Sequence, residues 1–148
     1  MKKIIQYILA IAFLYSLLPV CQASAAEIGQ IEQMSNSVQI LRNNNKIQGR
    51  VGELVRKEDT ILTGSNSNVW ITFTDNSQFS LGANSRVELS EYTYNPGKKR
   101  GNFSSTVRKG TLVVVRGKIA KFSPQAMKVR TRTSTISVRG TKFMVKVE

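Results

Sequence analysis

From residue 27 onward, apolar residues recur at every second position in short runs that end at turn-forming residues. One such run carries Val69, Ile71 and Phe73, with polar or aromatic residues between them. Side chains of a β-strand point alternately to opposite faces, so this pattern predicts strands with one buried face. Beyond residue 27, no stretch of useful length spaces its apolar residues as a helix would. The chain is therefore predicted to be all-β.

Turn residues divide these runs into short segments. Clusters at 43–45, 75–77 and 82–85 are rich in Asn, Asp, Ser and Gly, which accept the backbone conformations of turns. The segment that begins at Gly82 also echoes the one that begins at Gly64, eighteen residues earlier. Short strands with this spacing predict a single domain that forms a β-sandwich or β-roll, and the echo leaves a solenoid-like arrangement open.

Two apolar features bear on which faces of the sheet are covered. The uninterrupted run Leu112-Val113-Val114-Val115 predicts a strand buried on both faces. Trp70 falls on the polar face of its run, where it could stack on a sugar or anchor a protein contact. Such a residue more often packs beneath a loop or a second layer, so we expect Trp70 to be covered and keep it as a candidate contact aromatic.

Residues 1–26 have the three parts of a secretory signal peptide. Lys2 and Lys3 are followed by an apolar run at 4–20 and by small residues at 23–26. An uncleaved membrane anchor is the alternative, because the run is close to the length that spans a bilayer. The small residues favour cleavage, so we expect residues 27–148 to be exported to the periplasm or the medium as one domain without a transmembrane helix.

The predicted mature chain has neither cysteine nor histidine, because Cys21 lies in the signal peptide. It therefore lacks the thiol nucleophile, the histidine base and the zinc ligands that many enzymes use. A pair of carboxylates could still hydrolyse glycosides, but Asp59 and Asp75 are typical of turns. We expect no enzyme, no cofactor and no bound metal.

The charge of the chain is concentrated in its C-terminal part. Residues 27–97 hold six basic and eight acidic residues, whereas residues 98–148 hold fourteen basic residues and one acidic residue. Within the basic part, Lys128, Arg130 and Arg132 stand at every second position, so a strand would place them on one face. Lys142 and Lys146 could extend that basic stripe.

Two interpretations of the basic stripe remain open. It could bind an anionic envelope polymer such as peptidoglycan, lipopolysaccharide or acidic lipid. Alternatively, its charges could only keep a sheet edge solvated and unpaired. Nucleic acid is not expected as a partner, because the chain is predicted to be exported and carries no aromatic-basic recognition motif.

The segment Val138-Arg139-Gly140-Thr141 joins two runs whose alternation is out of phase. Upstream, the apolar residues Ile136 and Val138 stand at even positions. Downstream, the apolar residues stand at odd positions, namely Phe143, Val145 and Val147. Both runs can face one core only if the chain bends between them, and glycine permits such a bend. We therefore expect a structural corner here, with Gly140 the least replaceable residue.

These motifs resemble the FecR domain of bacterial exported regulators and envelope proteins. The most specific of them is the Val-Arg-Gly-Thr-x-Phe pattern at 138–143. The others are Val51-Gly52-Glu53-Leu54-Val55 with Asp59-Thr60-Ile61-Leu62-Thr63-Gly64, the run from Val69 to Ser77, and Lys109-Gly110-Thr111-Leu112-Val113-Val114. Glu58 and Asn76 depart from the glycines of the family pattern. The chain also lacks the anti-sigma and transporter-contact regions of FecR itself, so iron-uptake signalling is not carried over.

The resemblance, which spans about residues 28–147, implies an exported all-β module that binds other molecules. Our leading hypothesis is a non-catalytic envelope protein, an interaction or regulatory module with a periplasmic or membrane protein as its partner. The alternative is binding of an anionic envelope polymer through the basic C-terminal half.

Overall fold

A computed structural model describes residues 25–138 and 140–148 of the chain. The predicted signal peptide lies outside the described residues apart from its last two positions, and Arg139 of the corner motif lies outside them as well. The described chain consists of strands and one short helix, so the all-β prediction is confirmed.

The strands follow one another closely along the chain. They are β1 (Glu27–Ser35), β2 (Val38–Arg42), β3 (Asn45–Gln48), β4 (Leu54–Arg56), β5 (Thr60–Thr63), β6 (Asn68–Phe73), β7 (Gln78–Leu81), β8 (Arg86–Asn95), β9 (Arg100–Val115), β10 (Met127–Arg130), β11 (Thr135–Ser137) and β12 (Lys142–Val147). The helix α2 (Lys118–Phe122) follows β9.

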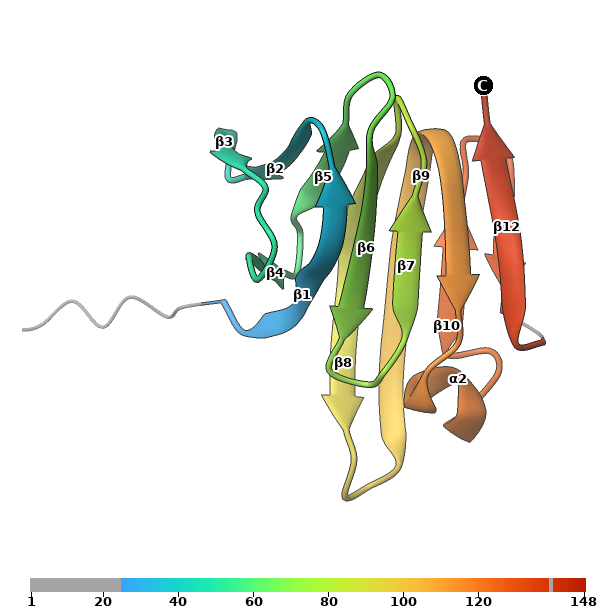
Figure 1. The fold of residues 1–148 in the computed structure, drawn as a ribbon. Coiled ribbons are helices and arrows are strands. Elements are labelled where there is room, and N and C mark those ends of the chain that lie inside the picture. Colours follow the sequence, from blue (N-terminus) through green and yellow to red (C-terminus); the bar gives the residue numbers. More distant parts are fainter. Residues whose placement is uncertain (1–24, 139) are drawn as a thin grey trace, which may run out of the picture.

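All twelve strands belong to one curled sheet, in which nine follow the order β3-β2-β5-β8-β9-β7-β6-β1-β4. The other three lie off this path: β10 pairs with β9 and β11, and β12 pairs with β9. The front half contains β4, β1, β6, β7, the end of β9 and β12 (Figure 1). The back half contains β3, β2, β5, β8, the start of β9, β10 and β11. The two halves face each other as in a roll, so the sandwich-or-roll prediction is confirmed and the solenoid-like alternative is not what forms.

The core lies between the two halves and is filled by the inward face of each strand. In β6, Val69, Ile71 and Phe73 are buried, as the alternation predicts. Phe73 packs edge-on against Phe79 and Phe103, with ring centroids 4.8 and 4.7 Å apart. Burying aromatic side chains in this way supplies a large share of the apolar stabilisation of a small domain.

Four of the corners at which the chain passes from one half of the sheet to the other share one feature. They fall between β1 and β2, between β5 and β6, between β7 and β8, and within β9. Each corner has a residue with a positive φ angle, namely Asn36 (57°), Asn66 (53°), Asn84 (52°) and Gly110 (89°). Asparagine and glycine are the residues that accept this left-handed conformation at low cost.

Hydrogen bonds join these corners in two pairs. In the first pair, the hydroxyl of Ser67 accepts the N–H of Ser37 at 3.0 Å. The carbonyl of Ser37 in turn accepts the N–H of Gly64 at 2.9 Å. The corner between β1 and β2 is thereby fixed to the corner between β5 and β6.

The second pair repeats this arrangement. The hydroxyl of Ser85 accepts the N–H of Thr111 at 3.0 Å, and the carbonyl of Thr111 accepts the N–H of Gly82 at 3.0 Å. The sequence echo between the segments at 64 and 82 therefore marks two equivalent corners, in which a glycine and a serine make the same two bonds.

Gly110 is the glycine that this arrangement constrains most. A Cβ atom at Gly110 would overlap the side chain and the Cα of Ser85, whereas a Cβ at Gly140 would meet nothing within 4 Å. The expectation that Gly140 is the least replaceable residue is therefore wrong. Gly140 has a positive φ of 97°, but the space beside it is open.

A buried carboxylate organises the opposite end of the domain. Asp75 is fully buried, and its oxygens accept hydrogen bonds from the hydroxyl of Ser77 (2.6 Å) and the N–H of Ile119 (3.2 Å). These bonds attach the start of α2 to the turn between β6 and β7. The sequence predicted the turn but not the helix, because five residues are too few to show a helical period.

The hydroxyl of Tyr92 completes this polar cluster. It donates to Asp75 Oδ1 at 3.3 Å and accepts the N–H of Asp75 at 3.0 Å. Burial raises the pKa of Tyr92 well above its ordinary value, because the phenolate would lose its hydration.

We expect Gly110→Ala to destabilise the domain far more than Gly140→Ala. Both changes force alanine into a positive φ, which costs about 1–2 kcal/mol, but only the first also drives a methyl group into Ser85, which costs a further ~1–3 kcal/mol. Urea unfolding followed by circular dichroism measures both costs. Equal losses in the two variants would contradict the close packing of the corner.

Tyr92→Phe tests the buried cluster. The folded-state pKa is raised, so the tyrosine contributes its stability fully below the unfolded pKa of about 10 and loses it as pH rises further. The variant should be less stable by ~1–3 kcal/mol at pH 8, because it leaves polar groups without partners. The difference in the free energy of unfolding between the variant and the wild type should become smaller above pH 10. A difference in the free energy of unfolding that stays constant between pH 8 and 11 would contradict the raised pKa of Tyr92.

Candidate functional site

The outer surface of the front half carries a row of side chains that crosses four strands. Strand pairing aligns Trp70 of β6 with Ser80 of β7, Val113 of β9 and Met144 of β12. A second row aligns Thr72, Gln78, Val115 and Lys142. We call these eight residues the front face.

The front face exposes apolar side chains. Trp70 is 46% exposed and Met144 is 67% exposed, and Val113 and Val115 are only half-buried. Two expectations are therefore wrong. The strand at 112–115 is buried on one face rather than both, and Trp70 does not pack beneath a second layer, because no described element covers the outside of the front half.

A shallow hollow lies at the centre of the front face. It has a volume of about 140 Å³ and is lined by Trp70, Gln78, Phe79, Ser80, Val113, Val115 and Lys142. Its walls combine an indole ring and two valines with amide and hydroxyl groups. This mixture of apolar area and few polar groups is typical of surfaces that bind other molecules.

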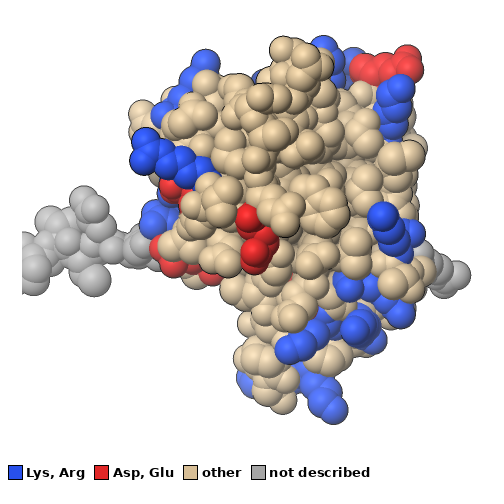
Figure 2. Space-filling model, viewed as in Figure 1, with Lys and Arg blue, Asp and Glu red and all other residues tan. Residues whose placement is uncertain are grey.

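Charge is distributed unevenly around the front face. In the view of Figure 2, much of the visible face is uncharged, and basic side chains gather at the lower right, with others along the left, top and right edges. Acidic side chains lie left of the centre and at the upper right corner. Lys142 and Lys146 of β12 are exposed on the same side as Met144. The apolar row therefore ends at a basic border.

The predicted basic stripe does not form one surface. Lys128 and Arg130 lie on β10 in the back half, opposite the buried Met127 and Val129 on that strand. Arg132 lies beyond the end of β10. Lys142 and Lys146 lie on β12 in the front half, so the structure separates them from the residues that they were expected to extend.

Other basic residues come together at the lower end of the molecule. The hairpin between β8 and β9 exposes Lys98, Lys99 and Arg100, and α2 exposes Lys118 and Lys121. Figure 2 shows Lys and Arg side chains gathered over this region. The sequence predicted the hairpin only as a loop, and nothing in its pattern indicated that the loop and the helix would lie at the same end of the molecule.

A hollow of about 460 Å³ lies beside this basic end. It is lined by Arg116, Ser123, Pro124, Gln125 and Gly140. The Nε of Arg116 is buried without a hydrogen-bond partner in the described chain. A guanidinium with unused donors can bind an anion, although the hollow itself is open.

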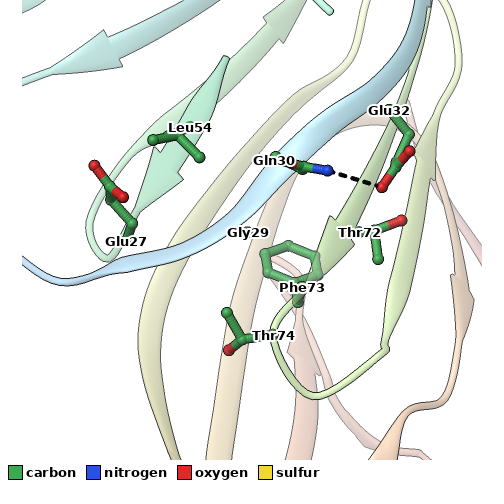
Figure 3. A pocket seen from close by; sticks show the side chains of 8 residues that line it. All are labelled: Glu27, Gly29, Gln30, Glu32, Leu54, Thr72, Phe73 and Thr74. Atoms are coloured by element: carbon green, nitrogen blue, oxygen red, sulfur yellow. Dashed lines mark hydrogen bonds between the residues drawn. The ribbon is translucent and has the colours of Figure 1, made fainter. Parts of the chain in front are cut away.

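An acidic groove lies at the other end of the front half. It has a volume of about 340 Å³ and is lined by Glu27, Gly29, Gln30, Glu32, Leu54, Thr72, Phe73 and Thr74 (Figure 3). The amide of Gln30 donates to Glu32 at 3.2 Å. A Cβ at Gly29 would lie 2.6 Å from the carbonyl oxygen of Thr72, so this glycine lets β1 approach β6 closely.

The two aspartates that the sequence assigned to turns do hold turns. Asp59 is buried, and its oxygens accept bonds from Arg42 Nε at 2.9 Å and from the N–H of Arg56 at 2.8 Å. Its hydrogen bond raises the pKa of Arg42 above the ordinary value. Asp75 is engaged with Ser77 and Tyr92, as described above.

The motif at 138–141 connects the two halves of the sheet. It follows β11 in the back half and precedes β12 in the front half. Val138 is buried and its N–H donates to the carbonyl of Met127 at 3.0 Å, while the carbonyl of Thr141 accepts the N–H of Arg116 at 3.1 Å. The change of phase coincides with this passage, but the expectation that the upstream run faces the core holds for Val138 and is wrong for Ile136, which is 38% exposed.

The described residues contain no cluster of three or more acidic side chains that could hold a metal ion. They also contain no helix long and apolar enough to cross a bilayer.

Comparison with protein families gives one match. The family model described as "FecR protein" matches residues 59–148, which cover β5 to β12 and include all eight residues of the front face. No curated protein and no solved structure matches the chain.

Proposed function

Because the chain belongs to the FecR protein family, we propose that it is a non-catalytic interaction module that binds a partner protein in the cell envelope through its front face. Membership of the family indicates a regulatory or interaction role. The partner, the exported location and the binding surface are our proposals.

The exposed apolar row is the observation that carries this proposal. Trp70 and Met144 leave large apolar side chains in water on a face that nothing else in the described chain covers. Aromatic residues and methionine are enriched at the centres of protein interfaces, and charged residues are depleted there. A row that is apolar at Trp70, Val113 and Met144 and has a basic border therefore suits a protein surface whose rim is acidic.

The proposal of an envelope location is supported by the sequence of residues 1–26. A basic start, an apolar run and a small-residue exit together favour export and cleavage. The absence of cysteine and histidine from residues 27–148 supports a role that requires neither redox chemistry nor histidine catalysis.

Site-specific photocrosslinking tests the front face. A photoreactive residue at Ser80, in the centre of the row, should give a discrete protein adduct in cells. The same residue at Gln39 on the outside of β2 in the back half should give none, because it lies away from the front face. Trp70→Ala should reduce the Ser80 adduct while changing the free energy of unfolding by less than about 1 kcal/mol, since the indole is half exposed.

Two results would contradict the proposal. One is the absence of any adduct from Ser80, and the other is an equal yield of the same adducts from Ser80 and Gln39.

A second candidate function is binding of an anionic envelope polymer, and the basic end supports it. Lys98, Lys99 and Arg100 are exposed at the same end of the molecule as α2, and the hollow that contains Arg116 lies beside it. Such a cluster attracts phosphate or carboxylate groups in a salt-dependent way.

Co-sedimentation distinguishes the possible polymers. If this function holds, the protein should pellet with cell-wall sacculi or with anionic liposomes at low salt and be released at high salt. Replacing Lys98, Lys99 and Arg100 together by Ser should reduce pelleting more than replacing Lys128, Arg130 and Arg132 by Ser, since only two of the latter share a strand face and Arg132 lies beyond the end of β10. Pelleting that does not depend on salt, or none at all, would contradict this function.

A further inference from the structure

The strand β12 has one free edge. It pairs with β9 through the register from Lys142 opposite Val115 to Val147 opposite Gly110, and it pairs with no other described strand. Its six residues make it longer than the other strands that pair with a single neighbour, β3 with four residues and β4 and β11 with three each. An unpaired edge of this length can accept another strand.

The register shows which backbone groups point out of the sheet. The N–H of Arg116 donates to the carbonyl of Thr141, so these two residues form a hydrogen-bonded pair across β9 and β12. Such pairs alternate along antiparallel strands. The backbone groups of the odd-numbered residues of β12 therefore face β9, whereas those of Lys142, Met144 and Lys146 face the free edge.

The side chains of β12 differ sharply between its two faces. Lys142, Met144 and Lys146 are exposed on the outside. On the inside, Val145 is buried, but Phe143 and Val147 are only partly buried. A further strand beside β12 would cover the open sides of these two apolar residues and would satisfy the free backbone groups.

Resting on the proposed binding of a partner protein, we propose that the partner adds an extended segment to the free edge of β12 as an antiparallel strand. Acidic residues of this segment face Lys142 and Lys146, and apolar residues cover Phe143 and Val147. The edge adjoins the front face, because Met144 ends the row that begins at Trp70.

Charge complementarity determines the sequence pattern of the segment. Residues directly opposite each other on neighbouring strands have Cβ atoms about 4.5–5.5 Å apart, so opposite charges there attract and like charges repel. The partner segment therefore carries an acidic residue opposite each lysine of β12 and an apolar residue opposite each of the three inward positions. Any strand-forming residue can stand opposite Met144.

The same rule argues against a second copy of this chain as the occupant. Two β12 strands that pair antiparallel about Met144 would place Lys142 of each copy opposite Lys146 of the other. Both pairs would repel. In this register the lysines discourage self-association, and they favour an acidic strand as the occupant.

A synthetic peptide tests this proposal directly. The probe is fluorescein-labelled Val-Glu-Val-Thr-Val-Glu-Val between Gly-Ser flanks, and its binding to the full chain is measured by fluorescence anisotropy. The peptide with Lys in place of Glu should bind about tenfold more weakly. The double variant Lys142→Glu with Lys146→Glu should reverse this preference, because it exchanges the charges on the strand.

Backbone methylation tests whether the peptide binds as a strand. In the antiparallel arrangement, the Glu and Thr residues bond to β12 and the Val residues face away from it. N-methylation of the Glu and Thr residues should therefore abolish binding, whereas N-methylation of the valines should leave it within about twofold. Equal effects of the two methylation patterns would overturn the proposal.

Two variants of the protein test whether the backbone of β12 takes part in the binding. Met144→Pro removes one N–H that faces the free edge and leaves the bonds to β9 intact, and proline is tolerated at such edge positions. Met144→Thr keeps the N–H and serves as the control. Peptide binding should be lost in the first variant and kept in the second, with both folded by circular dichroism.

The outcome separates this proposal from the proposed function. If Ser80 crosslinks to a protein in cells but neither peptide binding nor the adduct responds to Met144→Pro, the partner binds without strand addition and this inference fails alone. Peptide binding without any adduct from Ser80 would leave the edge as a strand acceptor and would contradict the front-face function. A dimer in analytical ultracentrifugation that Met144→Pro dissolves would overturn the choice of occupant.

Discussion

The packing of Gly110 against Ser85 is the constraint on which the rest of the front half depends. The strand β9 belongs to the back half at its start and to the front half at its end, and it changes sides at Gly110. The hydroxyl of Ser85 holds the corner by accepting the N–H of Thr111. Because β7 and β12 both pair with the part of β9 that follows this corner, the position of the front face is set here.

The local pattern of the sequence predicted the strands well and their assembly less well. Alternation at 69–73 correctly gave a strand with one buried face, and the echo between Gly64 and Gly82 correctly indicated related turns. The basic stripe was not predictable in this way, because alternation fixes the face of a residue within its own strand only. Whether two strands share a face depends on the half of the sheet to which each belongs, and β10 and β12 belong to different halves.

The wrong prediction that Val113 and Val115 are buried has a different cause. A continuous apolar run is ordinarily buried on both sides, so the sequence predicted a covering layer. The described chain provides no such layer, and the outward valines are left half exposed beside Trp70. Disagreement between a local rule and the structure is expected where a surface is shaped for binding rather than for stability. The same residues that misled the burial prediction therefore define the candidate site.

The composition of β12 connects its free edge with the front face. An exposed strand edge invites aggregation, and lysine is one of the residues that natural sheets use to prevent it. Lys142 and Lys146 meet this need, but protection alone does not account for Phe143 and Val147, whose inward side chains remain partly open. A fully protected edge would have its apolar side chains closed off by the existing strands. The combination of charged residues outside and incompletely covered apolar residues inside is instead complementary to a strand that brings both acidic and apolar residues. Strand addition also requires no deep pocket, which is consistent with a front face whose central hollow has a volume of only about 140 Å³.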